Sequence, residues 1–336
     1  MTIASPRPLF FPLLLLFVAM CVALPIKRWG VNGRLHGWLD NRLGFHRDLP
    51  DLALALYPGQ TPVPYNRYSE DGPASLYCYF ADENMASHTG LLVCVGGGYS
   101  SLSMNKEGQE CIRHLRALGL HIFILRYTVN PKVQQRPRSP NGVFPQPINE
   151  VIRAMRLLRA NADYFEIDSD RIGVAGFSAG GHVASTLGTH YDFGNPYADD
   201  FVDRVSSRPD FMLLAYPVIT MRLKTGSDSR GNLLGKNPPE YLVDFLSNDE
   251  HVTPDTPQTF IIHADDDSMV SSQHSVLFHR ALQRNNVPHQ FLMLESGNHG
   301  VGMRFWLTEL SEWLRRMNLV KQSTLDAHGR PISVEK

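Results

Sequence analysis

A glycine-framed serine that follows a short apolar segment constrains the fold of this sequence more than any other feature. The segment 171–175 is mostly β-branched or small, as in a buried strand of a parallel sheet. Gly176-Phe177-Ser178-Ala179-Gly180 follows it directly, and residues 179–190 have the pattern of a helix. A G-x-S-x-G sequence between a strand and a helix predicts a sharp, strained turn that holds the serine hydroxyl clear of the backbone.

The other apolar segments alternate between the periods of strands and helices. Strands are expected at 75–80, 91–95, 121–126, 171–175, 211–215, 259–263 and 290–294. Helices are expected at 107–118, 149–161, 179–190, 272–285 and 303–317. Because strands and helices in alternation form βαβ units, we predict an α/β fold with a mostly parallel central sheet and helices on both faces.

Composition narrows the classes of partner. The 336 residues include 32 Lys and Arg against 33 Asp and Glu, so the formal charge of -1 leaves no basic excess for a nucleic-acid backbone. The four cysteines form no CxxC pair and no Cys/His cluster with the spacing of zinc ligands. We therefore expect no nucleic-acid partner and no metal site.

A serine hydroxyl is a weak nucleophile, so Ser178 needs a histidine as its base and a carboxylate that orients the histidine. The sequence offers both after predicted strands, in the chain order Ser, Asp, His. His299 lies in a glycine-flanked loop after the last strand and is the expected base. Asp267 is the expected acid because it stands three residues before Val270, and the neighbouring Asp266 is the alternative.

The loop after the strand 91–95 supplies the second requirement of acyl transfer, which is a set of N–H donors for a negatively charged oxygen. Gly96-Gly97-Gly98-Tyr99 lets backbone N–H groups face a ligand without obstruction by side chains. We assign the donors as the N–H groups of Gly97 or Gly98 and of Ala179. A glycine-rich turn needed only for chain reversal is the alternative, and a nucleotide loop is disfavoured because no G-K-[ST] follows.

Three further side chains receive roles from their positions. Tyr99 ends the glycine loop and Phe177 precedes the serine, so both are expected to close a small acyl pocket. His182 lies within the helix 179–190, where packing or a supporting hydrogen bond is expected rather than catalysis. The stretch 217–257 breaks the alternation of strands and helices and is rich in polar and turn residues, so we predict an excursion over the active site.

The first residues have the pattern of a targeting signal. Arg7 precedes an apolar run over 9–24, which has the length of a signal-peptide core and is slightly short for a membrane span. Cleavage is expected after Ala23, although Lys27 and Arg28 follow closely and leave an uncleaved membrane anchor as the alternative. In both cases the remaining chain lies outside the cytoplasm, and membrane contact is confined to this segment.

These patterns divide the chain into four parts. Residues 1–24 are the signal peptide or anchor, and 25–70 are an extension without sustained periodicity that is expected to pack on the domain edge. Residues 71–320 form the catalytic domain, and 321–336 are a tail.

Taken together, the motifs resemble the bacterial acetyl esterase and acetylxylan esterase branch of the α/β-hydrolases, which is related to the hormone-sensitive-lipase-like esterases. The resemblance covers about 76–314 and departs at Val95, where many relatives carry His or Pro. It is carried by Gly96-Gly97-Gly98-Tyr99, Glu107-Gly108, Arg171-Ile172-Gly173-Val174, Gly176-Phe177-Ser178-Ala179-Gly180-Gly181-His182, Ser207-Arg208-Pro209-Asp210, Tyr216-Pro217-Val218, Asn232-Leu233-Leu234-Gly235, the Asp267 loop and Asn298-His299-Gly300.

This resemblance implies an α/β-hydrolase fold without a cofactor and the hydrolysis of small acyl esters, often acetyl groups on sugars. The expected partner is therefore a small acyl ester or an acetylated carbohydrate. A serine peptidase is one alternative, although no propeller repeat precedes the domain. A longer-chain lipid esterase is disfavoured by the polar stretch 224–237, and a non-catalytic binding module by the presence of Ser, Asp and His together.

Overall fold

One sheet of eight strands organises the residues that the computed structural model describes, which are 49–64, 72–131 and 139–321. The strands lie in the order β1-β2-β4-β3-β5-β6-β7-β8. Their bounds are β1 (Leu52–Ala55), β2 (Ser75–Tyr79), β3 (Gly90–Cys94), β4 (His121–Arg126), β5 (Ile172–Phe177), β6 (Phe211–Ala215), β7 (Gln258–Ala264) and β8 (His289–Leu294).

The sheet is parallel except at one edge. β2 pairs antiparallel with both β1 and β4. The remaining neighbours in the sheet order, β4-β3-β5-β6-β7-β8, all pair in parallel. Strands β3, β4, β5 and β6 are buried at every position, as expected for strands covered on both faces. The expected mostly parallel sheet is therefore confirmed, and each expected strand lies within two residues of its predicted bounds.

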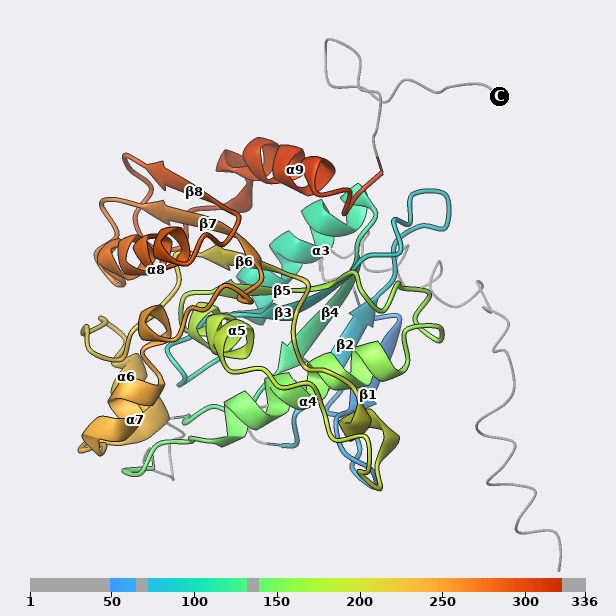
Figure 1. The fold of residues 1–336 in the computed structure, drawn as a ribbon, viewed down its shortest axis with the longest axis horizontal. Helices are drawn as coiled ribbons and strands as arrows, with labels where there is room; N and C mark the ends of the chain where they lie inside the picture. Colours follow the sequence, from blue (N-terminus) through green and yellow to red (C-terminus); the bar gives the residue numbers. More distant parts are fainter. Residues whose placement is uncertain (1–48, 65–71, 132–138, 322–336) are drawn as a thin grey trace, which may run out of the picture. The chain divides into compact units, whose positions relative to one another are not determined.

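Helices cover both faces of this sheet (Figure 1). The helices α4 (Gln146–Ala160), α5 (Ala179–Thr189) and α8 (Gln273–Arg284) lie on one face, and α3 (Gln109–Leu115) and α9 (Leu307–Arg316) lie on the other. The short turns η2 (Met104–Gly108), η3 (Arg116–Leu118) and η6 (Met303–Phe305) flank α3 and α9. A further turn, η4 (Phe201–Arg204), packs against α4.

The strand β1 shows that the N-terminal extension does more than pack on the domain edge. Leu52–Ala55 pairs with β2, so the sheet begins before residue 71, where the sequence had placed the domain boundary. A four-residue strand is too short to show a period, which is why the pattern did not predict it. The expected signal segment, its cleavage position at Ala23 and the tail from 322 lie outside the described residues.

The excursion over 217–257 contributes more buried side chains to the core than its sequence suggested. It contains α6 (Ser229–Leu234), α7 (Glu240–Phe245) and the turn η5 (Asn248–Glu250). Its inner side is buried, as at Ile219 and Leu233, and Asn232 donates a hydrogen bond from Nδ2 to the carbonyl oxygen of Gly98 at 2.8 Å. The excursion therefore braces the glycine-rich loop after β3.

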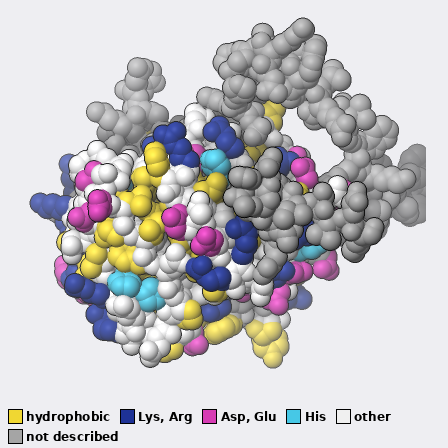
Figure 2. Space-filling model, turned by 90° about the horizontal axis from the view of Figure 1, so that it is seen from above, with side chains coloured by type: hydrophobic (Ala, Val, Ile, Leu, Met, Phe, Trp, Pro, Cys, Tyr) yellow, Lys and Arg dark blue, Asp and Glu magenta, His cyan; other side chains and the backbone are white. Residues whose placement is uncertain are grey.

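The surface has no large field of one charge on the face seen in Figure 2, where Lys and Arg, Asp and Glu, and apolar side chains are interspersed. This agrees with the near-neutral formal charge of the whole chain. Among the described residues, no helix has both the length and the apolar character needed to cross a bilayer.

Candidate active site

Ser178 sits on a strained turn at the centre of the carboxyl edge of the sheet. Its backbone has φ 52° and ψ -122°, a conformation that residues other than glycine rarely adopt. Three hydrogen bonds hold the turn. The Ser178 N–H donates to the Ala215 carbonyl at 3.1 Å, and the Ser178 carbonyl accepts from the N–H groups of Gly181 and Val218. These bonds over-determine the strained conformation.

Close packing around the turn requires a residue without a side chain at position 180. A Cβ atom on Gly180 would overlap the carbonyl oxygen of Cys94 at the end of β3. The first turn of α5 therefore lies directly against the backbone of β3, and the helix begins beside the glycine-rich loop. The free N–H groups and the positive dipole end of α5 face the region in front of Ser178.

His299 connects Ser178 to Asp267 through two hydrogen bonds. The Ser178 hydroxyl lies 2.9 Å from His299 Nε2, and His299 Nδ1 lies 2.7 Å from Asp267 Oδ2. A carboxylate only accepts hydrogen bonds, so Nδ1 carries the proton and Nε2 accepts from the serine. The structure thus brings together the three residues that the sequence had singled out from β5, β7 and β8.

Asp267 is held as a buried carboxylate. Its Oδ1 accepts from the backbone N–H groups of Met269 and Val270, both at 2.9 Å, and its Oδ2 lies 3.2 Å from His263 Nε2. Burial alone would raise the pKa of Asp267, but hydrogen bonds from His263, His299 and Val270 outweigh it and hold the pKa well below its usual range. The acid therefore remains charged at neutral pH.

Asp266 takes a different position. Its side chain is exposed, and Oδ1 accepts from the backbone N–H of Asn298 at 2.7 Å. Asn298 Oδ1 in turn accepts from the Ser268 hydroxyl at 2.9 Å. Asp266 thus links the loop after β7 to the loop that carries His299, and it does not contact the imidazole.

The glycine-rich loop presents free N–H groups beside the serine. Gly97 has φ 133° and Gly98 has φ 63°, and a Cβ on Gly98 would lie 2.6 Å from Ser227 Cβ. Within the described part of the chain, the backbone N–H groups of Gly97, Gly98 and Ala179 donate to no backbone or side-chain acceptor. Unused donors at a helix N-terminus and a glycine turn can bind a developing negative charge.

Tyr99 does not line a pocket at the serine, contrary to the sequence expectation. Its ring is fully buried, and its hydroxyl lies 2.7 Å from His182 Nδ1. His182 Nε2 donates to the Leu246 carbonyl at 2.8 Å, and burial lowers the pKa of His182 to about 4, so the imidazole is neutral. His182 is a packing residue that supports the glycine-rich loop through Tyr99.

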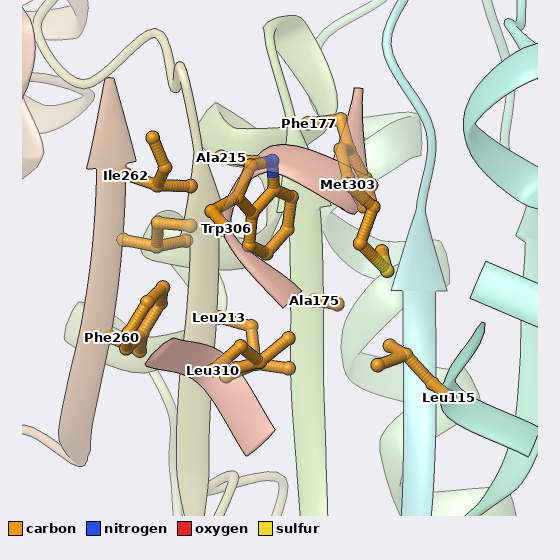
Figure 3. Close-up of a pocket in the computed structure, with 11 residues that line it drawn as sticks. Leu115, Ala175, Phe177, Leu213, Ala215, Phe260, Ile262, Met303, Trp306 and Leu310 are labelled. Carbon is orange, nitrogen blue, oxygen red and sulfur yellow. The ribbon is translucent and has the colours of Figure 1, made fainter. Parts of the chain in front are cut away.

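Phe177 is also misplaced by the sequence interpretation. Its side chain is buried and points into a small apolar cavity with Trp306 and Met303, on the face covered by α3 and α9 (Figure 3). Ala175 lines the same cavity, because residues two apart on a strand share a face. Phe177 therefore anchors β5 in the core and does not close an acyl pocket.

Three supporting residues received no role from the sequence. His263 contacts Asp267, and Asn232 contacts Gly98. Glu107 accepts a hydrogen bond from the Gly96 N–H at 2.5 Å. A histidine as the penultimate residue of the strand before the acid was the available signal for His263. Glu107 and Asn232 appeared in the sequence only as members of longer motifs, and no pattern there predicted that their side chains are buried.

Comparisons with known proteins agree with this architecture. The family model described as BD-FAE matches residues 78–282. Endo-1,4-beta-xylanase B of Butyrivibrio fibrisolvens is 32% identical over 68% of this chain and 34% of that protein. Acetylxylan esterase of Xylanibacter ruminicola is 29% identical over 85% of this chain and 57% of that protein. The chain thus spans less than two thirds of the length of either relative.

A solved structure matches most of this chain. The acetyl ester-xyloside bifunctional hydrolase of Caldicellulosiruptor lactoaceticus is 33% identical, with a TM-score of 0.71 over 81% of this chain and 98% of the other. The family match extends over more than half of the chain, and the strands β3 to β7 and the serine turn lie within it. The chain therefore belongs to the BD-FAE family of α/β-hydrolases.

Proposed function

We propose that this protein is a serine carboxylesterase that hydrolyses short acyl esters, chiefly acetyl esters, on sugars or xylan. The observation that carries the proposal is the hydrogen-bonded chain from Ser178 through His299 to Asp267, beside unused N–H groups. The names of two similar proteins, an acetylxylan esterase and an acetyl ester-xyloside hydrolase, support the acetyl group and the carbohydrate.

The reaction begins when His299 Nε2 removes the proton from the Ser178 hydroxyl as its oxygen attacks the ester carbonyl. The N–H groups of Gly97, Gly98 and Ala179 stabilise the oxyanion, and losing one such donor typically costs about 3 kcal/mol in the transition state. Asp267 fixes the imidazole tautomer and stabilises the imidazolium. The imidazolium then protonates the leaving alcohol, and water hydrolyses the acyl-enzyme by the same route.

A short acyl chain is supported by how little room the described residues leave at the serine. Ser178 is 5% exposed, and Ser227 stands against Gly98 at the side of the loop. Two cavities among these residues lie away from the serine: the apolar one under α9 lies behind Phe177, and a second is lined by Arg153 and Asp200. Neither of these two cavities gives a long acyl chain an apolar groove at the serine.

The first prediction concerns the nucleophile. Ser178→Ala removes the attacking oxygen without adding volume, so we expect esterase activity to fall by at least about a thousandfold while the fold is retained. The assay is hydrolysis of p-nitrophenyl acetate, with circular dichroism as the control for folding. Activity within tenfold of wild type, in a preparation free of other esterases, contradicts the proposal.

The second prediction compares two adjacent acids. Asp267→Asn favours the wrong imidazole tautomer, so kcat should fall by roughly a thousandfold or more. Asp266→Asn leaves the imidazole partner in place and weakens only the bond to the Asn298 backbone, so its loss should stay below about tenfold. Steady-state kinetics of the two variants decide the assignment, and the reverse order of losses refutes it.

The third prediction concerns the acyl group. Each methylene that enters an apolar groove contributes about 0.8 kcal/mol, so a long groove would make kcat/KM rise with chain length. We expect kcat/KM to fall from acetyl or butyryl to octanoyl p-nitrophenyl esters, and acetate to be released from acetylated xylan. A maximum at octanoyl or longer, without acetate release from acetylated glycans, points instead to a lipid esterase.

Export is a further part of the proposal. It is supported by Arg7 and the apolar run 9–24, which have the order of a signal peptide. The fourth prediction is that protein expressed with its full N-terminus in a bacterial host is recovered outside the cytoplasm and begins at Leu24. Intact protein in the membrane fraction supports the anchor alternative, and intact protein in the cytoplasm rules out both.

A further inference from the structure

Glu107 is a buried carboxylate that the reaction described above does not use. It belongs to η2, the turn that follows the glycine-rich loop, and its residue exposure is 5%. Its Oε2 accepts from the Gly96 N–H at 2.5 Å, and its Oε1 accepts from the Tyr216 hydroxyl at 3.3 Å. Glu107 thus joins the start of the glycine-rich loop to the residue that follows β6.

Both partners of Glu107 lie against the reacting residues. A Cβ on Gly96 would lie 2.9 Å from Ser178 Cβ and 3.1 Å from Glu107 Oε2, so the carboxylate and the serine side chain meet at the same glycine. The Tyr216 ring stands edge-on to the His299 imidazole, with centroids 5.1 Å apart. Tyr216 has φ 39°, so its backbone is held in a strained conformation at this position.

The charge of Glu107 has no close partner of opposite sign. Among the described residues, no Lys, Arg or His nitrogen lies within 4.0 Å of its carboxylate oxygens. The titratable groups that interact with it are Lys106 and Cys111 from its own segment, Tyr216 from beyond β6 and His299 from beyond β8. The carboxylate of Glu110, on the next turn, acts on the same Cys111 and Tyr216. A buried carboxylate without an ion pair is costly, so it requires an explanation.

Burial raises the pKa of Glu107 to about 7, and the Gly96 hydrogen bond, the charge of a protonated His299, the Tyr216 hydroxyl and Lys106 oppose that rise. A carboxyl whose pKa is raised on folding binds more protons in the folded state than in the unfolded state. Glu107 therefore lowers the stability of the fold progressively as the pH rises from its unfolded pKa to its folded one. Packing alone gives no reason to keep it.

We propose that Glu107 is a positioning residue, whose carboxylate fixes the glycine-rich loop and the Tyr216 ring, and whose negative charge stabilises the imidazolium that forms at His299. The inference rests on the proposed esterase function. Glu107 takes no proton in the reaction. The serine proton moves to His299 Nε2 and then to the leaving alcohol, while Glu107 stays ionised throughout.

The fifth prediction uses Glu107→Gln, which keeps the shape and an oxygen acceptor for the Gly96 N–H but removes the charge. The matched control is Glu110→Gln, since Glu110 is on the adjacent turn of the same segment and accepts from the Met303 N–H instead. We expect kcat/KM for p-nitrophenyl acetate to fall about tenfold to hundredfold in E107Q and less than about threefold in E110Q.

The pH profile separates a role of the charge from a role in packing. In wild-type enzyme kcat/KM should still rise as the pH passes 7, because Glu107 must be ionised to act. In E107Q that contribution is absent, so the acid limb of the profile should move to lower pH by about half a unit or more. The same comparison is made with the rate at which a fluorophosphonate labels Ser178, a reaction that needs the triad but no carboxylic ester.

The free energy of unfolding provides a further test. Removing the charge of a merely structural residue would lower this free energy, whereas the present proposal predicts no loss at pH 8. E107Q should resist urea unfolding at least as well as wild type at pH 8, and its advantage should shrink at pH 5, where the wild-type carboxyl is protonated in the fold. Tyr216→Phe, which removes only the hydroxyl contact with Glu107, should lose less activity than E107Q.

The outcomes are distinguishable. Wild type, E110Q and E107Q could all be labelled by the probe and hydrolyse the ester at the same rates, with the same acid limb of the pH profile. In that case the role of Glu107 is refuted and the esterase function stands. If E107Q loses activity only in proportion to a loss of stability at pH 8, Glu107 is structural and the inference is also refuted. If wild-type protein neither reacts with the probe nor hydrolyses any ester, the proposed function fails and this inference fails with it.

Discussion

The strained turn at Ser178 is the constraint on which the rest of the site depends. Its positive φ is tolerated because β6 and the segment beyond it hold the Ser178 backbone from both sides. The contact of Gly180 with the end of β3 then fixes α5 beside the glycine-rich loop. One backbone conformation therefore sets the direction of the serine hydroxyl and the position of the N–H groups that face it. Strain at such a site is stored because the surrounding core is rigid.

Parallel strand order brings the remaining groups to the same place. β3, β5, β7 and β8 all end at one edge of the sheet, and the loops that follow them carry Gly97, Ser178, Asp267 and His299. This is why widely spaced residues could be assigned to one site from the sequence alone. The strand-to-turn-to-helix pattern predicted each loop, and the chain order of Ser, Asp and His predicted their roles.

Side-chain direction and burial were harder to predict than the elements. Phe177 was assigned to the acyl pocket because it precedes Ser178 in the sequence. The period of two along β5 instead places its side chain on the same face as Ala175, in the core. Tyr99 was assigned from its position at the end of the glycine-rich loop, although its hydroxyl bonds to His182 inside the fold. The error at Tyr99 reflects long-range packing, which a local pattern does not contain, whereas the alternation that places Phe177 in the core is a local pattern.

Two buried carboxylates carry charge near the imidazole of His299, Asp267 in direct contact and Glu107 at a greater distance, and their environments differ in a way that suits separate roles. Asp267 receives backbone N–H groups at Oδ1 and histidines at Oδ2, so its charge is stabilised before any reaction begins. Glu107 receives one N–H and one hydroxyl and, among the described residues, no ion pair within 4.0 Å, so its charge is stabilised further when His299 becomes positive. An interaction that strengthens only as charge develops lowers the barrier without tightening the ground state. The stability that a lone buried carboxylate costs the fold is then the counterpart of the effect proposed for Glu107 on the reaction.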